Sequence, residues 1–591
     1  MNRFHKKALV KAMLVATAIS LTACGSDDDN NDQAVTPAAT PELTFIGVQA
    51  PATDAEKRAI FASEAVVDGK TYAGSYNTLA RSGEDYNGVT FGQLVDKNGT
   101  VLTSTDGSIN VTNSNEHTSL LPIGNKLFSV AQMESTPGAM FLMELNQNKE
   151  TGALSVKNMS QIDQSSVNGG WVHCAASVTP WTTHLASEEY EPDAKSPNSG
   201  QRSMLKYYGP SNEAEWNPYY YGWNIEVEVS EDASTELTKH YTMGRLAFEM
   251  AYVMPDSKTA YLTDDGTDVG LFMFVADTAG DLSAGKLYAA KWQQKTANNG
   301  GSADISWIDL GHASNDEIKP FVVGSNTQPK ATFADIFLTE DPVNNACSSG
   351  YTFIKANNKA ECLQVKPGMD KIASRLETRR YAAMKGATTE FLKEEGVTFD
   401  TLRNKLYVAM SSVGKGMSDG KGHIQLEEEN SCGIVYELDV ASNASVGSEY
   451  VANNMSALVV GRPVSESDPQ VVGFENNNTC HIDGIANPDN VTYMSGYDKL
   501  IIGEDTGSGH QNDVIWAYEF DDKSLTRIQT TPYGAETTSP YWYPNINGWA
   551  YLMSVIQHPY GESDNDKDTG AGENFAYTGY VGPFPAVTEK K

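Results

Sequence analysis

The chain has 591 residues, of which 40% are hydrophobic and 9% aromatic, so it can bury a large core and is not a disordered chain. Its formal net charge of −33 at pH 7 argues against nucleic acid and anionic membrane surfaces as partners. The charge fits a soluble protein that faces a medium containing cations. Clustered acids in such a chain could hold Ca²⁺, which prefers oxygen ligands.

The N-terminus predicts export and lipid attachment. Residues 1–23 have a basic start and a short apolar run, and the sequence LTAC that ends at Cys24 resembles a bacterial lipobox. We expect cleavage before Cys24, acylation of its thiol, and an acidic flexible tether over residues 24–42. Gly25 follows the cysteine where aspartate would favour the inner membrane. The expected location is therefore the bacterial cell envelope, at the outer membrane, on its periplasmic or its external side.

One pattern recurs through residues 43–591, which we predict to form a single domain. It consists of a short apolar strand, a turn rich in Pro, Asp, Asn or Gly, and a second apolar strand, as in a β-hairpin. In chain order the occurrences are SLLPIGNKLFSVAQ, SVTPWTTHLASEE, AYVMPDSKTAYLTDD, VTFDTLRNKLYVAMSS, VTYMSGYDKLIIGED and PYWYPNINGWAYLMSVIQH. Each hairpin is interpreted as part of one repeating unit.

Six such hairpins predict an all-β fold, a six-bladed β-propeller with one hairpin per blade, because radial closure protects the strand edges. The alternative is a β-sandwich with many strands. Helical periodicity is scarce, and residues 374–392 form the clearest predicted helix, placed between blades. Insertions are expected near residues 191–215 and 293–370.

Polar residues occupy equivalent places in the hairpins. Just before the first strand stand Glu116, Cys174, Glu249, Glu395, Asp489 and Glu536, one per hairpin. Just after the second strand stand Gln132, Glu188 with Glu189, Asp264 with Asp265, Ser411, Glu504 with Asp505, and Gln557 with His558. The start of the first strand and the end of the second lie side by side in a hairpin. We therefore expect these groups at one mouth of the central channel.

Close carboxylates repel one another and are costly to bury unless cations neutralise them. Carboxylates alone suit Ca²⁺, whereas a thiolate suits iron, zinc or copper. The pattern thus predicts a mixed metal centre on the propeller axis, with Cys174 bound to a transition metal. A single acid is usually a solvated turn residue, but this explanation is weak for acids that recur in successive repeats.

The cysteine count agrees with this interpretation. Apart from Cys24, five cysteines remain in an oxidising compartment. Cys347 and Cys362 flank a short Gly- and Asn-containing loop and are predicted to form a disulfide, and Cys432 and Cys480 could form a second. Cys174 is then left as a free thiol, either a metal ligand or a buried inert cysteine.

Several segments resemble the PhoX-type alkaline phosphatase family. The family carries Asn-Cys-Ala-Gly-Gly-x-Thr-Pro-Trp-Gly-Thr followed by Glu-Glu, which stands here as HCAASVTPWTTHLASEE. Similar segments follow in the same order: YYYGWNIEVEV, GRLAFEMAYVMPDSKTAYLTDDG, ETRRYAAMKGATTEFLKEEGVTFDTLRNKLYVAMSS, ANPDNVTYMSGYDKLIIGEDTG and YGAETTSPYWYPNINGWAYLMSVIQHP. The likeness covers roughly residues 110–560.

The resemblance implies a six-bladed propeller and a phosphomonoesterase that uses two iron ions and calcium. It implies that Cys174, Glu249 and Glu395 bind iron. The implied calcium ligands are Glu188, Glu189, Asp264, Asp265, Asp489, Glu504, Asp505 and Glu536. Lys393 stands where the family has the arginine that grips phosphate, and with Glu395 and Cys174 it forms the predicted catalytic set. The implied partner is a small phosphate ester, and the protein is expected to be a monomer without nucleic acid.

Other positions depart from the family pattern. Ala176, Ser177 and Thr182 replace glycines and are expected to narrow the site, Phe248 replaces a histidine, and the N-terminus lacks a twin-arginine pair. Lys393, Ser177 and Phe248 motivate an alternative function, a non-enzymatic, calcium-stabilised surface propeller that binds a ligand or partner. A third hypothesis is a propeller hydrolase that acts on esters or lactones.

Overall fold

The computed structural model describes residues 42–72, 74–465, 468, 478–561 and 574–587. These belong to one compact unit, Pro41–Lys591. The predicted signal peptide 1–23, Cys24 and nearly all of the predicted tether lie outside the described residues. In the described part of the chain, no helix is both long enough and apolar enough to span a bilayer.

In the described part of the chain, five antiparallel sheets of four or more strands form six blades, because the ten-stranded sheet contains two of the blades. Blade one contains β8 (Asn115–Ile123), β9 (Lys126–Met133), β10 (Ala139–Gln147) and β11 (Leu154–Gln161). Blade two contains β12 (Ala176–Val178), β13 (His184–Ala186), β14 (Ile225–Val229) and β15 (Thr235–Lys239). Blade three contains β16 (Phe248–Val253), β17 (Thr259–Asp264), β19 (Phe272–Thr278) and β20 (Asp281–Thr296), with β21 (Ser302–Ser314) as a fifth strand.

The other three blades follow in chain order. Blade four contains β26 (Glu394–Asp400), β27 (Lys405–Met410), β28 (Ile434–Asn443) and β30 (Asn454–Val460). Blade five contains β31 (Pro488–Met494), β32 (Lys499–Glu504), β33 (Val514–Glu519) and β34 (Leu525–Thr530). Blade six contains β35 (Glu536–Ile546), β36 (Trp549–Gln557), β37 (Tyr577–Pro585) and, as its outermost strand, the N-terminal β5 (Tyr76–Arg81).

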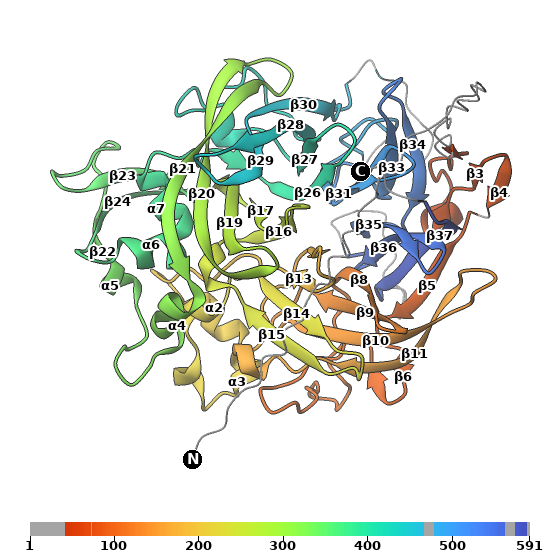
Figure 1. The fold of residues 1–591 in the computed structure, drawn as a ribbon, viewed down its shortest axis with the longest axis horizontal. Helices are drawn as coiled ribbons and strands as arrows, with labels where there is room; N and C mark the ends of the chain where they lie inside the picture. Colours follow the sequence, from red (N-terminus) through yellow and green to blue (C-terminus); the bar gives the residue numbers. More distant parts are fainter. Residues whose placement is uncertain (1–41, 73, 466–467, 469–477, 562–573, 588–591) are drawn as a thin grey trace, which may run out of the picture. The chain divides into compact units, whose positions relative to one another are not determined.

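The first strands of the blades, β8, β12, β16, β26, β31 and β35, contact one another in succession, and β35 returns to β8 (Figure 1). The ring is closed by β5, which comes from the start of the chain and pairs with β37 from its end. This arrangement confirms the predicted six-bladed β-propeller. The alternative of a β-sandwich is wrong.

Hydrophobic clusters between neighbouring blades stabilise the ring. One cluster joins Leu120 and Phe141 of blade one to Met553 of blade six, and another joins Tyr407 of blade four to Trp516 of blade five. Burial of one such side chain stabilises the fold by about 1.5–3 kcal/mol. Because each blade packs on both faces, strands such as β17 and β31 are buried along their whole length.

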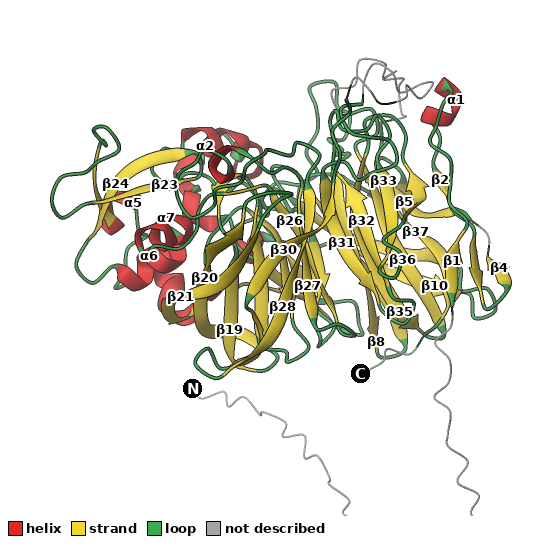
Figure 2. Ribbon diagram, turned by 90° about the horizontal axis from the view of Figure 1, so that it is seen from above, coloured by secondary structure: helices red, strands yellow, loops and turns green. Residues whose placement is uncertain are grey.

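Two groups of elements lie outside the blades. The first contains α2 (Asn198–Ser203) and α3 (Leu205–Tyr208). The second contains α4 (Asn315–Val323), α5 (Phe333–Ile336), α6 (Asp370–Leu376), α7 (Thr378–Met384) and the sheet β22 (Phe337–Glu340), β24 (Lys359–Val365), β23 (Thr352–Ala356). Figure 2 shows the helices of the second group gathered beside β20 and β21.

The predicted helix over residues 374–392 is shorter than expected. The structure has α6 and α7, and α7 ends at Met384. Gly386 follows with φ +83°, a left-handed conformation that ends helices. The chain then continues into β25 (Phe391–Leu392), which forms a separate two-stranded sheet with β18 (Thr267–Val269), between β17 and β19 in the chain.

The remaining short elements lie mainly near the N-terminus of the unit. They are β1 (Leu43–Phe45), α1 (Asp54–Lys57), β2 (Phe61–Ala62), β3 (Ala65–Val67), β4 (Lys70–Tyr72), β6 (Asp85–Tyr86), β7 (Val89–Thr90) and, in blade four, β29 (Ser448–Ala452). Disulfides join Cys347 to Cys362 and Cys432 to Cys480. Among the described residues, Cys174 is a free and buried cysteine.

Candidate active site

The strand registers bring the two ends of each inner hairpin together. Phe248 pairs with Asp264, Pro488 with Glu504, and Glu536 with Gln557, so the starts of β16, β31 and β35 lie beside the ends of their partner strands. The polar positions selected from the sequence therefore meet at one end of the ring of inner strands.

A cluster of six ionisable side chains, here called the axial cluster, forms at this end. Its ligand-type atoms fall into three overlapping groups, and within each group they lie within 4.8 Å of one another. The groups are Glu116–Cys174–Glu249, Glu116–Asp489–Glu536 and Glu249–Glu395–Asp489. All six residues are buried, and each comes from a different blade.

Hydrogen bonds orient several members of the axial cluster. Cys174 Sγ donates to Glu249 Oε2 over 2.8 Å, and Asn490 Nδ2 donates to Glu249 Oε1 over 2.8 Å. Ser411 Oγ donates to Glu395 Oε1 over 2.6 Å. Asp489 Oδ2 is buried and has no hydrogen-bond partner among the described residues. The cluster is thus partly ordered by the protein and keeps unused ligand capacity.

Burial and the charges of neighbouring acids raise the pKa values of five members of the axial cluster, Glu116, Cys174, Glu249, Glu395 and Asp489. Burial is the largest cause for Glu249, whose pKa rises to about 7, and for Cys174, whose pKa rises well above its usual value. For Asp489, burial acts first, and the charges of Glu249 and Glu395 raise its pKa further. Such groups ionise together at neutral pH only if cations compensate their charge.

The axial cluster fits metal ions by its chemistry. It offers five carboxylates and one thiol, all buried, with an unpaired carboxylate oxygen at Asp489. Carboxylate oxygens suit hard cations, and a thiolate adds affinity for a transition metal. A fourth group, Glu340 with Cys347 and Cys362, is not a candidate metal site, because its two sulfur atoms form a disulfide.

The three acidic pairs that end the second strands divide into two kinds of residue. The second members, Glu189, Asp265 and Asp505, lie beside the axial cluster. Burial and then the charge of Asp265 raise the pKa of Glu189 well above its usual value. Burial would raise the pKa of Asp265 as well, but Lys393 lowers it overall.

The first members of these pairs are occupied by protein partners. Glu188 Oε1 accepts from Lys239 Nζ over 2.8 Å in a buried ion pair. Asp264 accepts two hydrogen bonds from the guanidinium of Arg379, one of them over 2.7 Å. Glu504 belongs to the same kind, since its carboxylate accepts four hydrogen bonds: from Trp516 Nε1, from His510 Nδ1 and from the backbone N–H groups of Ala486 and Val514.

Lys393 supplies a positive charge next to the axial cluster. Its ammonium lies 2.7 Å from Asp265 Oδ2 and 3.2 Å from Glu395 Oε1. Burial would lower the pKa of Lys393, but Glu395 and Asp265 raise it, so the side chain is charged. The side chain is 30% exposed and can therefore be reached from solvent.

The positions after the second strands of the other blades have different roles. Gln132 donates to the carbonyl of Cys174 and contacts His184 Nε2 over 2.8 Å. Gln557 Nε2 donates to Glu116 Oε2, and His558 Nε2 lies 3.1 Å from Glu536 Oε2. These side chains hold the axial acids from the outside of the cluster.

Sequence reasoning did not assign several residues that the structure places here. The hairpin pattern includes Glu116, but the family resemblance implies no ligand role for it. Glu134 lies just past β9, accepts from Gln557 Nε2 over 3.1 Å, and has a pKa raised to about 7, chiefly by burial. Glu394 is buried and both its carboxylate oxygens lack a hydrogen-bond partner among the described residues. In the sequence, Glu394 is indicated only by its place in the motif EEG.

The departures from the family pattern fall in different places. Ser177 Oγ donates to the carbonyl of Ala251 over 2.6 Å, and Ala176 is the first residue of β12. Phe248 is fully buried in a hydrophobic cluster. Thr182 lies in the turn between β12 and β13, with φ +68°, at the end of the hairpin away from the axial cluster. Thr182 therefore does not narrow the site.

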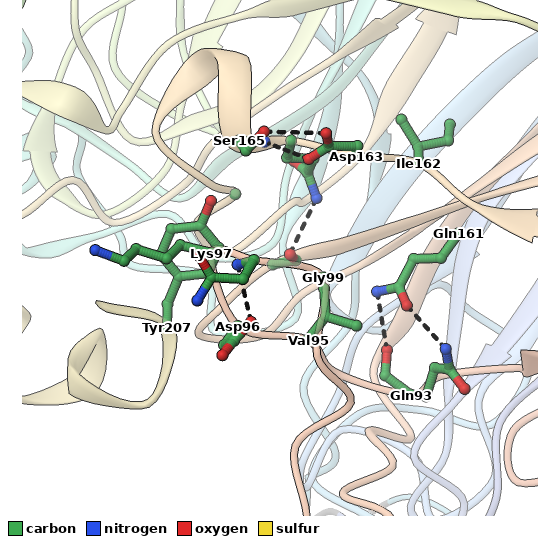
Figure 3. Close-up of a pocket in the computed structure, with 14 residues that line it drawn as sticks. Gln93, Val95, Asp96, Lys97, Gly99, Gln161, Ile162, Asp163, Ser165 and Tyr207 are labelled. Atoms are coloured by element: carbon green, nitrogen blue, oxygen red, sulfur yellow. Dashed lines mark hydrogen bonds between the residues drawn. The ribbon is translucent and has the colours of Figure 1, made fainter. Parts of the chain in front are cut away.

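A cavity of about 450 Å³ lies elsewhere, between the segment 93–99, the end of β11 and Tyr207 (Figure 3). Its polar groups bond mainly to one another, as Gln93 does with Gln161 and Asp163 with Ser165. No member of the axial cluster lines it.

The fold and the site together define a β-propeller enzyme with an acidic centre on its axis. Residues 142–559 match the alkaline phosphatase PhoX family, and the chain belongs to this family of phosphatases. A comparison with curated proteins gives no match.

One of the similar solved structures shows the same fold. The chain is similar to Pseudomonas fluorescens PhoX in complex with vanadate, with a TM-score of 0.59, 15% identity, and coverage of 92% of this chain and 98% of that one. It also matches XC5397 from Xanthomonas campestris, described as a gluconolactonase, with a TM-score of 0.27, 9% identity, and coverage of 78% and 91%. A putative 6-phosphogluconolactonase from Bacteroides uniformis matches with a TM-score of 0.28, 10% identity, and coverage of 88% and 92%.

Proposed function

We propose that the protein is a metal-dependent phosphomonoesterase that hydrolyses phosphate monoesters outside the cytoplasm. The observation that carries this proposal is the axial cluster, to which each of the six blades contributes one ionisable side chain. Membership of a phosphatase family supports the same reaction. It gives no support to a non-enzymatic propeller or to a lactonase.

The ligand set that we propose follows the geometry. Cys174, Glu249 and Glu395 would hold the iron pair, since they contain the thiol and lie within the overlapping groups. The calcium ligands would come from Glu116, Glu189, Asp265, Asp489, Asp505 and Glu536. We assign the first member of each acidic pair to orientation of the site, because other side chains already bind its carboxylate. Glu188 is bound by Lys239, and Asp264 by Arg379. Glu504 is bound by His510 and Trp516.

The chain's own residues contribute binding and electrostatics. Bound metal ions would supply Lewis acidity toward the phosphoryl group. The Lys393 ammonium would bind a phosphate oxygen as a point charge, without the two-pronged contact that an arginine makes. Ser411 and Asn490 hold the carboxylates of Glu395 and Glu249 in fixed orientations. Preorganised groups of this kind stabilise the charge that develops in the transition state.

The direct test is release of phosphate from an aryl phosphate by the purified mature protein and by two variants. Cys174→Ser and Glu395→Ala should each abolish the release while circular dichroism shows a folded propeller. Glu231→Gln, at an exposed position, serves as the matched control and should keep full activity. Full activity in both axial variants would refute the proposed site.

We also propose that the enzyme is anchored by lipid at Cys24 and acts as a monomer in the cell envelope. The LTAC sequence before the acidic tether supports the anchor. Cys24→Ser should move the protein from the membrane fraction to the soluble fraction. Unchanged membrane association of that variant would contradict the anchor.

A further inference from the structure

Tyr190 lies beside the axial cluster and remains half-exposed. Its side chain follows two buried acids, Glu188 and Glu189, yet the residue is 49% exposed. An exposed aromatic ring is common in proteins and by itself has no special meaning. This one is distinguished by the way in which both its side chain and its backbone are fixed.

The hydroxyl end of Tyr190 is bound within the site. Tyr190 Oη donates to Asp265 Oδ2, the same oxygen that accepts from Lys393 Nζ. The Lys393 ammonium lies 3.4 Å from Tyr190 Oη. The ring therefore stands next to the positive charge at which a phosphate group would bind.

The backbone of Tyr190 is held in an unfavourable conformation. Its φ is +46°, which is unusual for a bulky residue. The indole Nε1 of the buried Trp171 donates to the carbonyl of Glu189 over 2.9 Å and to that of Tyr190 over 3.2 Å. Trp171 in turn stacks on Tyr221, with ring centroids 5.3 Å apart.

Lys393 is held in the same way on the facing segment. Its φ is +54°, its N–H donates to the carbonyl of Gly266 over 2.7 Å, and its carbonyl accepts from the N–H of Ser411 over 3.1 Å. Two strained residues that face each other, each fixed by its surroundings, are typical of a functional site.

This geometry determines where the organic part of a substrate would lie. Cys174, Glu249 and Glu395 are buried, whereas Tyr190 and Lys393 are partly open to solvent. A phosphate group held at the ammonium would direct its ester oxygen and organic group toward that open side, past the exposed tyrosine ring. A planar aromatic group gains contact with such a ring by stacking, which a short alkyl group cannot do.

We propose that Tyr190 is a specificity-determining residue whose ring contacts the organic group of the substrate. It favours phosphate monoesters that carry a planar aromatic group close to the ester oxygen. This inference rests on the proposed phosphatase function and names its substrate class.

The test compares benzyl phosphate with butyl phosphate, because both release a primary alcohol and differ mainly in the ring. The wild type should hydrolyse benzyl phosphate with a kcat/KM about three- to tenfold higher. Tyr190→Phe should keep this preference, and Tyr190→Ala should lose it. Tyr190→Asn is a second variant without the ring, chosen because asparagine tolerates positive φ. Leu402→Ala, which removes an exposed apolar side chain in the β26–β27 turn, is the control and should behave as wild type.

Calorimetric binding of benzylphosphonate and butylphosphonate, which are not hydrolysed, gives a readout without turnover. A preference for the benzyl ligand that disappears in both ring-free variants supports the inference, even if no hydrolysis occurs and the phosphatase proposal fails. If the wild type hydrolyses the substrates and both Tyr190→Ala and Tyr190→Asn keep its preference for the benzyl compound, the inference is overturned and the phosphatase proposal stands. Equal binding of the two ligands by the wild type also overturns it.

Discussion

The acids at the ends of the inner hairpins form two adjacent sets that differ in their contacts. Glu188, Asp264 and Glu504 are saturated by partners such as Lys239 and Arg379. Their immediate neighbours, Glu189, Asp265 and Asp505, face the axial cluster. Successive residues of an extended chain point in opposite directions, so one acidic pair serves both purposes.

In each acidic pair, the first residue is thus bound by other groups of the protein, and the second lies beside the axial cluster. The first carboxylate ties the strand end to donor groups of the protein, which are cations at Glu188 and Asp264, and these contacts fix the direction of the second. For Asp264 the cation is Arg379 on α7, so the second group of elements outside the blades helps to position the site.

The largest expected effect separates the two members of one pair. Asp264→Asn should lower the free energy of unfolding by about 3–5 kcal/mol, because it removes a carboxylate from the buried guanidinium of Arg379. Asp265→Asn should change it much less, because its partner Lys393 is 30% exposed and the loss of that ion pair is offset by relief of the repulsion with Glu189. Urea unfolding of both variants, made under the same metal conditions, measures the difference. Equal losses of unfolding free energy in the two variants would contradict the difference between the first and second members of the pair.

The second effect concerns activity in the axial cluster. Glu249→Gln should lower kcat/KM for an aryl phosphate by about a hundred- to a thousandfold, because Glu249 belongs to two of the three ligand groups. Its hydrogen bond from Asn490 can persist, so the fold should remain. Steady-state kinetics with Glu231→Gln as control would reveal the change. A loss below tenfold would remove Glu249 from the site.

The sequence predicts features that depend on residues close together in the chain, and it does not predict features that depend on contacts between distant residues. The hairpin ends are local, so the pattern predicts the ring and the position of Glu116, Cys174 and Glu249. The partner of Asp264 lies 115 residues away on α7, and no periodicity reveals it. The roles within each acidic pair, like the exposure of Tyr190, depend on such long-range contacts and could not be predicted.

The third effect is a pH dependence of stability in metal-free protein. Glu249 keeps its proton up to about pH 7 in the folded chain but releases it near its ordinary pKa of 4.5 when unfolded. The folded state therefore binds more protons in this interval, and its stability should fall as pH rises from 5 to 8, on the order of 3 kcal/mol for this one group.

Urea unfolding at pH 5 and pH 8, with and without a chelator, checks this dependence. Metal-loaded protein should not show the decline, because bound cations stabilise the ionised carboxylates. Chelated protein whose stability stays constant or rises over the same interval would contradict the assignment of Glu249 to a crowded, buried cluster.

The smallest expected effect concerns the residue that replaces the family's arginine. Lys393→Arg should lower KM for a phosphate monoester several-fold, because a guanidinium makes two parallel contacts with phosphate. kcat should change less. Kinetics of this variant beside Lys415→Arg, at an exposed lysine, provide the comparison. An unchanged or higher KM would show that Lys393 does not contact phosphate.

We propose above that the axial cluster is a catalytic metal centre of iron and calcium. The most direct measurement is elemental analysis of the purified mature protein, coupled to a phosphomonoesterase assay on the same preparation. We predict that both iron and calcium are present, that activity rises with metal content, and that Cys174→Ser loses iron together with activity. Folded wild-type protein that contains only calcium and releases no phosphate, even after reconstitution with iron, would contradict the account.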